Sequence, residues 1–199
     1  MSHYFINDDH LKSEEFEFYY YFNDFKFTFI SDFGVFSKNK VDFGTNLLIN
    51  SINIVDSKRV LDLGCGIGII GITLAKANPK SSFHLVDVNL RALKLAKKNS
   101  EINKARNVEI YKSNLYEKIK GNFDLIISNP PIRAGKKVVH QIIEDGFNYL
   151  DNGGEICVVI QKKQGAPSMK QKMKDVFGNV AIISKKNGYY VLCSKKGTY

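Results

Sequence analysis

Short apolar runs alternate with helically spaced apolar residues from Arg59 to about residue 177. The runs are nearly continuous in apolar residues, as is typical of parallel strands buried on both faces. Strands are predicted at Arg59–Leu63, Ser82–Val86, Val108–Lys112, Phe123–Ser128 and Glu155–Ile160. The alternation predicts an α/β fold, with helices covering a parallel sheet.

Two of the intervening helices are marked by apolar stripes at spacings of three and four residues. The first stripe consists of Val138, Val139, Ile142, Ile143, Phe147 and Leu150, and the second of Met169, Met173, Val176 and Phe177. Asp151-Asn152-Gly153-Gly154 is expected to end the first of these helices, because these residues favour turns.

The C-terminal residues change to a different pattern. Val180–Ser184 and Tyr189–Ser194 flank Lys185-Lys186-Asn187-Gly188, and Asn-Gly is the strongest short signal for a hairpin. An antiparallel hairpin is therefore predicted at the end of an otherwise parallel sheet.

The N-terminal segment is rich in aromatic residues. Glu14–Phe22 and Lys26–Ile30 are predicted to be strands that meet at Asn23-Asp24, and Phe43–Val55 a helix with its apolar residues on one side. The expected division is a β-rich extension over residues 1–42 and an α/β domain over residues 43–199. The extension could act as a lid or simply cover the sheet.

A length of 199 residues fits one domain with a short extension. No apolar run approaches the roughly 20 residues of a membrane span, and no signal peptide is visible, so a cytoplasmic location is expected. Cys65, Cys157 and Cys193 form no Cys-x-x-Cys pair, which argues against a zinc site or a disulfide framework. The four dispersed histidines likewise suggest no metal site.

The formal net charge of +9 suggests a polyanionic partner. Lysine outnumbers arginine by 25 to 4, as translation of an AT-rich genome would give. Base composition can therefore account for the choice of lysine, and both explanations of the charge stay open.

A glycine-rich turn joins the first predicted strand of the sheet to a helix, in Val60-Leu61-Asp62-Leu63-Gly64-Cys65-Gly66-Ile67-Gly68. Glycines allow a tight turn and close approach of a ligand to the backbone. Dinucleotide-binding enzymes use similar turns. Asp62 favours S-adenosylmethionine instead, because a carboxylate there can receive a methionine ammonium but would repel a pyrophosphate. The segment resembles the glycine-rich motif of methyltransferases, which implies that Gly64, Cys65, Gly66 and Gly68 bind cofactor.

Two further positions strengthen the cofactor interpretation. Asp87 ends the second strand, about 20 residues beyond the turn, where a carboxylate can accept both ribose hydroxyls. Asn114 follows the third strand, where methyltransferases commonly place Asp or Asn against the adenine amine; the alternative is an ordinary turn residue. Their neighbours Val88 and Leu115 are assigned to the same cofactor-binding set.

Asn129-Pro130-Pro131 follows the fourth strand. Two prolines make a rigid turn, which is the simplest interpretation of an isolated Asn-Pro-Pro. Its expected place at the carboxyl edge of the sheet, beside the cofactor, favours a catalytic role. The tripeptide resembles the Asn/Asp-Pro-Pro-aromatic motif of methyltransferases that modify planar amino nitrogens, although Ile132 stands where many of them carry an aromatic ring.

Together these segments resemble the small-domain methyltransferases, whose best-known members methylate guanine N2 in small-subunit ribosomal RNA. Gly34-Val35-Phe36-Ser37, Asp42-Phe43-Gly44-Thr45 and the stretch from Asn129 to Lys136 carry the resemblance. It implies a Rossmann-like class I fold, with seven mostly parallel strands, and S-adenosylmethionine as cofactor. It also implies ribosomal RNA or the small ribosomal subunit as partner. Substrate contacts are expected from Phe36, Ile132, Arg133 and Lys136.

Several alternatives remain open at this point. Larger relatives carry a duplicated N-terminal half, and this chain resembles the catalytic half alone. A second group of lysines is either an RNA contact or a solvated helix face; it consists of Lys162, Lys163, Lys170, Lys172 and Lys174. Other candidate functions are methylation of glutamine in a protein and non-catalytic binding during ribosome assembly. The chain could be a monomer or a homodimer.

Overall fold

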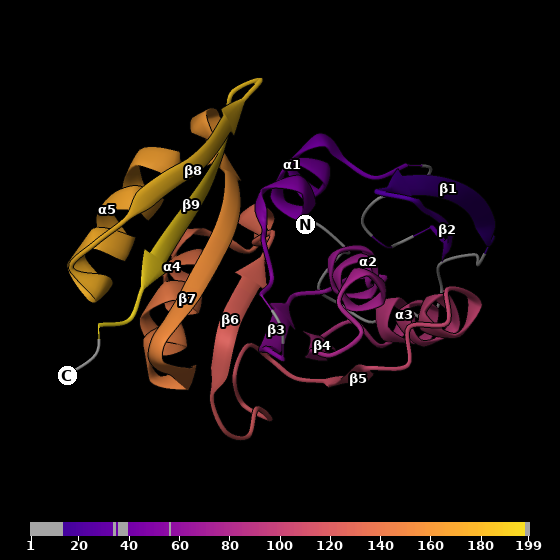
Figure 1. Ribbon diagram of the computed structural model, residues 1–199. Coiled ribbons are helices and arrows are strands. Elements are labelled where there is room, and N and C mark those ends of the chain that lie inside the picture. The colour runs from indigo at the N-terminus through magenta and orange to yellow at the C-terminus, as the bar shows by residue number, and fades with distance from the viewer. Residues whose placement is uncertain (1–13, 34, 36–39, 56, 198–199) are drawn as a thin grey trace.

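The computed structural model describes residues 14–33, 35, 40–55 and 57–197. A seven-stranded sheet runs through the molecule in the order β5-β4-β3-β6-β7-β9-β8 (Figure 1). Its strands are β3 Arg59–Leu63, β4 Ser82–Asp87, β5 Val108–Lys112, β6 Phe123–Ser128, β7 Leu150–Gln161, β8 Ala181–Lys186 and β9 Tyr189–Lys195. The strands β5, β4, β3, β6 and β7 are parallel to one another, whereas β9 is antiparallel to β7 and to β8. The predicted α/β class and the C-terminal antiparallel hairpin are confirmed.

Helices cover both faces of this sheet. One apolar cluster packs α1 Phe43–Ser51, α2 Ile69–Ala77 and α3 Leu90–Ile102 against one face. A second cluster packs α4 Lys136–Gly146 and α5 Ala166–Phe177 against the other. Short 3₁₀ turns lie at η2 Ile132–Ala134, η3 Phe147–Tyr149 and η4 Lys162–Gln164. No helix in the described part of the chain is long and apolar enough to cross a membrane.

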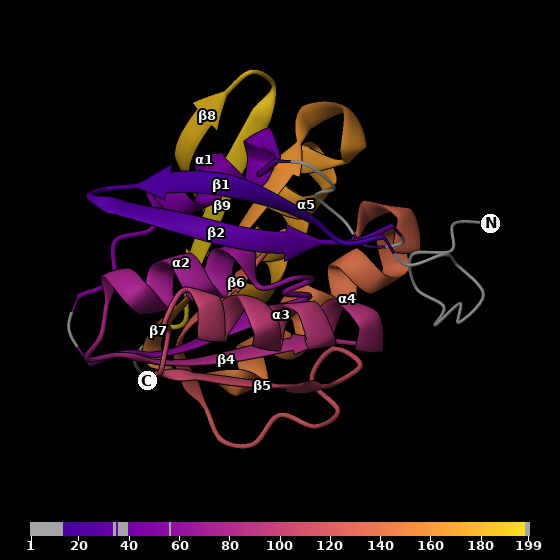
Figure 2. The same ribbon diagram turned by 90° about the vertical axis from the view of Figure 1, so that its right-hand side faces the viewer.

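The predicted N-terminal hairpin is present as β1 Phe16–Phe22 and β2 Phe25–Ser31. It forms a separate two-stranded sheet that lies over α2 and α3 (Figure 2). Asn99 of α3 and Asn103, which caps the C-terminus of that helix, bond to backbone groups of β2 through their side-chain amides, as another strand would. Asn99, which is fully buried, also donates to the Ile67 carbonyl at 3.0 Å, so one side chain links the hairpin to the glycine-rich turn.

Two helices are shorter than the apolar pattern predicts. α1 ends at Ser51 rather than Val55, and α4 ends at Gly146 rather than Leu150. Leu150 instead starts β7, where it pairs with Phe123 of β6. The expected turn at residues 151–154 is therefore part of a strand, and the register shifts there. Leu150 is buried as the stripe predicts, but in a strand.

The cysteine spacing argued against disulfides, and this expectation is wrong for one pair of cysteines. Cys157 and Cys193 form a disulfide across β7 and β9. The two residues are direct partners in the antiparallel register, although 36 residues separate them in the chain. Only the pairing of these two strands brings them together, and local spacing contains no sign of it.

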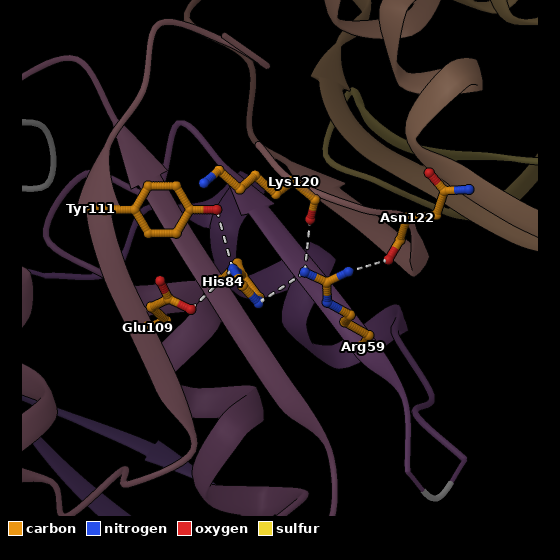
Figure 3. A network of polar contacts seen from close by, with 6 residues as sticks. All are labelled: Arg59, His84, Glu109, Tyr111, Lys120 and Asn122. Atoms are coloured by element: carbon orange, nitrogen blue, oxygen red, sulfur yellow. Dashed lines mark hydrogen bonds and ion pairs between the residues drawn. The ribbon is translucent and has the colours of Figure 1, made fainter. Parts of the chain in front are cut away.

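A polar network braces the chain where it enters β6 (Figure 3). Arg59 donates to the carbonyls of Lys120 and Asn122, both at 2.8 Å, and its guanidinium lies over the Phe123 ring. His84 lies 3.1 Å from the Tyr111 hydroxyl, and burial together with the Arg59 charge lowers the histidine pKa. The network fixes the turn before β6 and hence the position at which that strand begins.

Candidate functional site

The glycine-rich turn lies at the carboxyl end of β3, where the order of the sheet reverses between β3 and β6. Gly64, Gly66 and Gly68 all have positive φ, at 76°, 55° and 86°. A Cβ added at Gly64 or Gly66 would meet no atom within 4 Å, so open space lies above the turn. At Gly68 it would lie 2.6 Å from Ile72. The first two glycines thus leave room for a ligand, and the third allows close packing.

Asp62 lies beneath this turn and is fully buried. Its Oδ2 accepts from the Gly71 amide in α2 at 2.8 Å, while its Oδ1 has no partner among the described residues. Burial raises the pKa of Asp62 to about 7. Asp62 is therefore a buried acceptor with one oxygen unused, although this oxygen is closed to solvent in the structure.

Asp87 ends β4 and contacts the same turn. Its Oδ2 accepts from the Gly66 amide and its Oδ1 from the Asn89 amide, both at 2.9 Å. Burial raises the pKa of Asp87, and those amides oppose the shift. Asp87 and its neighbour Val88 are half-buried at the edge of the sheet. The carboxylate thus faces both the turn and the solvent-accessible space beside it.

Asn114 lies at the end of the neighbouring strand. The Ser113 amide donates to the Asp87 carbonyl at 3.1 Å, so the turn that follows β5 lies against the end of β4. The Asn114 side chain is exposed and donates to Glu117 at 2.7 Å. Leu115, at a φ of 47°, packs against the apolar cluster under α4 and α5. Both residues lie at the edge that carries Asp87.

Asn129-Pro130-Pro131 leaves β6 beside β3. Ser128 donates to the Leu63 carbonyl at 2.7 Å and so ties the end of β6 to the strand that enters the glycine-rich turn. The Asn129 amide donates through Nδ2 to Thr45 Oγ1 at 3.0 Å. No described residue donates to Asn129 Oδ1 or to the Pro130 carbonyl. Two acceptors on adjacent residues are thus unused at this edge.

The predicted substrate contacts differ in exposure. Arg133 and Lys136 are exposed directly after the prolines, on η2 and the first turn of α4. Ile132 is half-buried and packs against the cluster under α4 and α5. Its side chain is therefore partly used in packing. Phe36 lies outside the described residues.

The sequence analysis assigned no role to Thr45, although the segment Asp42-Phe43-Gly44-Thr45 was part of the family resemblance. Thr45 is 4% exposed in the first turn of α1, where its amide donates to Asp42 Oδ1 at 3.1 Å. It contacts Asn129 across 84 positions of the chain. No pattern within the sequence indicates that contact.

A sequence model of the methyltransferase small-domain family matches residues 26–193. An "Uncharacterized protein YbxB" of Bacillus subtilis (strain 168) is 44% identical over 197 residues, which are 98% of each chain. A "Ribosomal RNA small subunit methyltransferase C" of Haemophilus influenzae (strain PittGG) is 32% identical over 81% of this chain and 49% of its own. The chain thus spans about half the length of that relative.

The structural comparison agrees with the sequence matches. The T. thermophilus 16S rRNA N2 G1207 methyltransferase, solved in complex with AdoMet and guanosine, superposes with a TM-score of 0.83. The match has 26% sequence identity and covers 94% of this chain but 52% of the other.

The residues at the carboxyl edge fit S-adenosylmethionine, the cofactor of this family. The open space above Gly64 and Gly66 would admit it, and the half-buried Asp87 offers a carboxylate to hydroxyl groups. Asp62 supplies a buried carboxyl group beneath the turn, with one oxygen that has no described partner. A cationic ligand suits this pair of carboxylates better than a pyrophosphate does.

Proposed function

The chain belongs to the methyltransferase small-domain family and is an S-adenosylmethionine-dependent methyltransferase, and we propose that it methylates an exocyclic base amine of RNA. The proposed target is guanine N2 in small-subunit ribosomal RNA, modified in the cytoplasm. The relatives named as methyltransferases of small-subunit ribosomal RNA are about twice as long as the chain, so the shared half would have to supply both cofactor and amine contacts.

The observation that carries the proposal is the pair of unused acceptors at Asn129 and Pro130. An exocyclic amine on a base has two N–H donors in one plane, and its lone pair is shared with the ring. Two acceptors that hold both hydrogens direct the lone pair out of that plane. Most of the resulting rate gain is positioning and charge stabilisation.

S-adenosylmethionine, when bound, supplies an electrophilic methyl group on a sulfonium. The chain contributes the orientation of the attacking nitrogen: as the new N–C bond forms and the S–C bond breaks, the nitrogen gains positive charge. The Asn129 oxygen and the Pro130 carbonyl stabilise that charge through the hydrogens they hold. The proton then becomes acidic enough to leave to water, so the site needs no strong base.

A protein glutamine is the other candidate substrate, because its side-chain amide is also planar and has two N–H donors. The charge beside the site supports RNA instead. Arg133, Lys136 and Lys137 are exposed next to the prolines, where they are suited to phosphates that flank a target nucleotide. The relative solved with guanosine supports the same substrate class.

The proposal is tested by transfer of tritiated methyl groups to ribosomal RNA and to small ribosomal subunits from a strain that lacks this protein. The expected product after digestion is N2-methylguanosine, and Asn129→Ala is the inactive control. Label in a protein glutamine would replace the proposal with the alternative substrate. Binding of cofactor and subunits without transfer would identify a non-catalytic assembly factor.

A further inference from the structure

The positive charge of the chain is concentrated in its last 71 residues. Residues 129–199 contain twelve Lys and Arg but only five Asp and Glu, whereas residues 1–128 contain seventeen and fifteen. An AT-rich genome favours lysine over arginine in both parts, but it gives no reason for acidic residues to be scarce in one of them. The asymmetry therefore needs an explanation in the structure.

The structure places all five acidic residues of this segment away from one edge of the sheet, whereas its cations lie at both ends. The five acidic residues lie in the first half of β7 or towards the ends of α4 and α5; they are Asp151, Glu155, Glu144, Asp145 and Asp175. Seven cations lie at the opposite edge, on η2, the first turn of α4, η4 and the end of β8; they are Arg133, Lys136, Lys137, Lys162, Lys163, Lys185 and Lys186. All seven are exposed.

The turn between β8 and β9 projects beyond the ends of the other strands (Figure 1). The Lys162 amide donates to the Gly188 carbonyl at 2.7 Å, which holds η4 against this turn. Tyr189, the first residue of β9, packs its ring 5.4 Å from that of Phe43. Phe43 starts α1, whose Thr45 bonds to Asn129. Lys185 and Lys186, at the end of β8, are therefore linked to Asn129 through two side-chain contacts. These are the contacts Tyr189–Phe43 and Thr45–Asn129, which the first turn of α1 joins.

The structure assigns an RNA-binding surface to these seven cations, with the β8–β9 turn and η4 holding the RNA strand beside the target nucleotide. This inference rests on the proposed function. A polyanion matches a surface that contains none of the five carboxylates of residues 129–199, and closely spaced lysines are suited to successive phosphates. The lysine group predicted from sequence is divided: Lys162 and Lys163 belong to the surface, whereas Lys172 is paired with Glu144.

The test compares Lys185→Gln/Lys186→Gln with Lys94→Gln/Lys97→Gln, which removes the same charge from exposed positions on α3. Binding to a single-stranded fragment of small-subunit ribosomal RNA is measured from 0.05 to 0.3 M salt, together with cofactor affinity. Each lost phosphate contact should reduce the salt slope by about 0.7, so the first variant should bind about tenfold or more weakly at 0.1 M salt. The control should stay within about twofold of the wild type.

Equal losses in both variants would show that only net charge matters and would overturn the assigned surface. An unchanged slope in the first variant, with normal RNA methylation by the wild type, would do the same and leave the proposed function intact. If the wild type methylates protein and not RNA, the proposed function itself fails.

A separate observation concerns the orientation of the Asn129 side chain, and from it we infer that Thr45 is a positioning residue. An amide has a donor end and an acceptor end, and only the acceptor end can hold an amine hydrogen. Thr45 Oγ1 receives the Nδ2 donor, which leaves Oδ1 for the substrate. Thr45 is itself held by Asp42 at the start of α1. A flipped amide would face the target N–H with another donor.

Thr45→Val removes the hydroxyl and keeps the shape, and Thr45→Ser keeps the hydroxyl. We expect Thr45→Val to lower kcat about tenfold, with KM for RNA and cofactor affinity unchanged, and Thr45→Ser to restore most of the rate. If Thr45→Ser is as slow as Thr45→Val, or if cofactor binding falls with kcat, the hydroxyl does not act by orienting Asn129. RNA methylation by the wild type in the same assay keeps that result separate from a failure of the proposed function.

Discussion

The two halves of the sheet meet between β3 and β6, and they build their parts of the site in different ways. On the proposed cofactor side, Asp87 lies 21 positions after Gly66 of the glycine-rich turn and accepts from its backbone amide. On the proposed substrate side, the Asn129 amide donates to Thr45, 84 positions away. The cofactor part is thus determined by local backbone geometry, and the substrate part by packing between distant segments.

The same division appears in the charges. Residues up to 128 have nearly equal numbers of acidic and basic residues, and the later residues are strongly basic. A small cofactor is held by a few placed groups, whereas a polyanion is held by many cations over a wide surface. This comparison predicts that changes in one half leave the function of the other half largely intact.

The largest effect is expected from Asn129→Ala. Loss of one well-placed transition-state hydrogen bond costs roughly 10²-fold or more in rate. Cofactor affinity should change little, because the groups assigned to the cofactor lie on the other half. Single-turnover rates and cofactor titration of the same variant measure both quantities. A joint loss of binding and rate would break the division between the two halves.

A smaller effect is expected from Asp87→Ala, and it concerns cofactor affinity rather than the rate of methyl transfer. Hydrogen bonds to a charged group contribute about 1.5–3 kcal/mol each, so even the net loss of one should lower cofactor affinity about 10- to 100-fold. RNA affinity in the absence of cofactor should stay unchanged, since Asp87 lies away from the cationic surface. Calorimetry with cofactor and with RNA tests each half separately. Normal cofactor affinity in this variant would remove Asp87 from the binding set.

The sequence predicts the cofactor half more completely than the substrate half for the same physical reason. Positive φ at Gly64, Gly66 and Gly68 is a local requirement that glycine itself signals, and the strands β3, β5 and β6 lie where the apolar runs predict them. The Asn187-Gly188 turn is equally local, and both residues have positive φ.

Features that depend on pairing between distant segments could not be predicted. The disulfide follows from the β7–β9 register, and the early start of β7 follows from the partnership of Leu150 with Phe123. The Thr45–Asn129 contact requires α1 to pack beside the end of β6. The roles assigned to the individual residues, on the cofactor side as well as on the substrate side, remain predictions, as does the division at residue 42.

The smallest effect is a pH dependence that originates at Asp62. Burial raises the pKa of this carboxyl from 3.8 to about 7, so the folded protein retains a proton there that the unfolded chain loses near pH 4. Its contribution to stability is therefore greatest at low pH and is lost as the pH rises from about 4 to about 7. The nearby Cys65 thiol stays neutral, because burial raises its pKa as well.

A cationic ligand favours the ionised form of Asp62, so cofactor binding should release a proton and become tighter with rising pH. Between pH 6 and pH 8 we expect the apparent affinity to rise about tenfold, because each pH unit below the pKa costs up to a factor of ten. Calorimetry in buffers of different ionisation enthalpy counts the proton. Asp62→Asn still has an oxygen for the Gly71 amide but does not titrate, so its cofactor affinity should not change with pH across this range.

If Asp62→Asn keeps the full pH dependence, the proton belongs to another group, with Asp87 the next to test because its pKa is also raised. If the wild type itself binds with the same affinity at both pH values, Asp62 serves the cofactor half only by holding α2 against the turn.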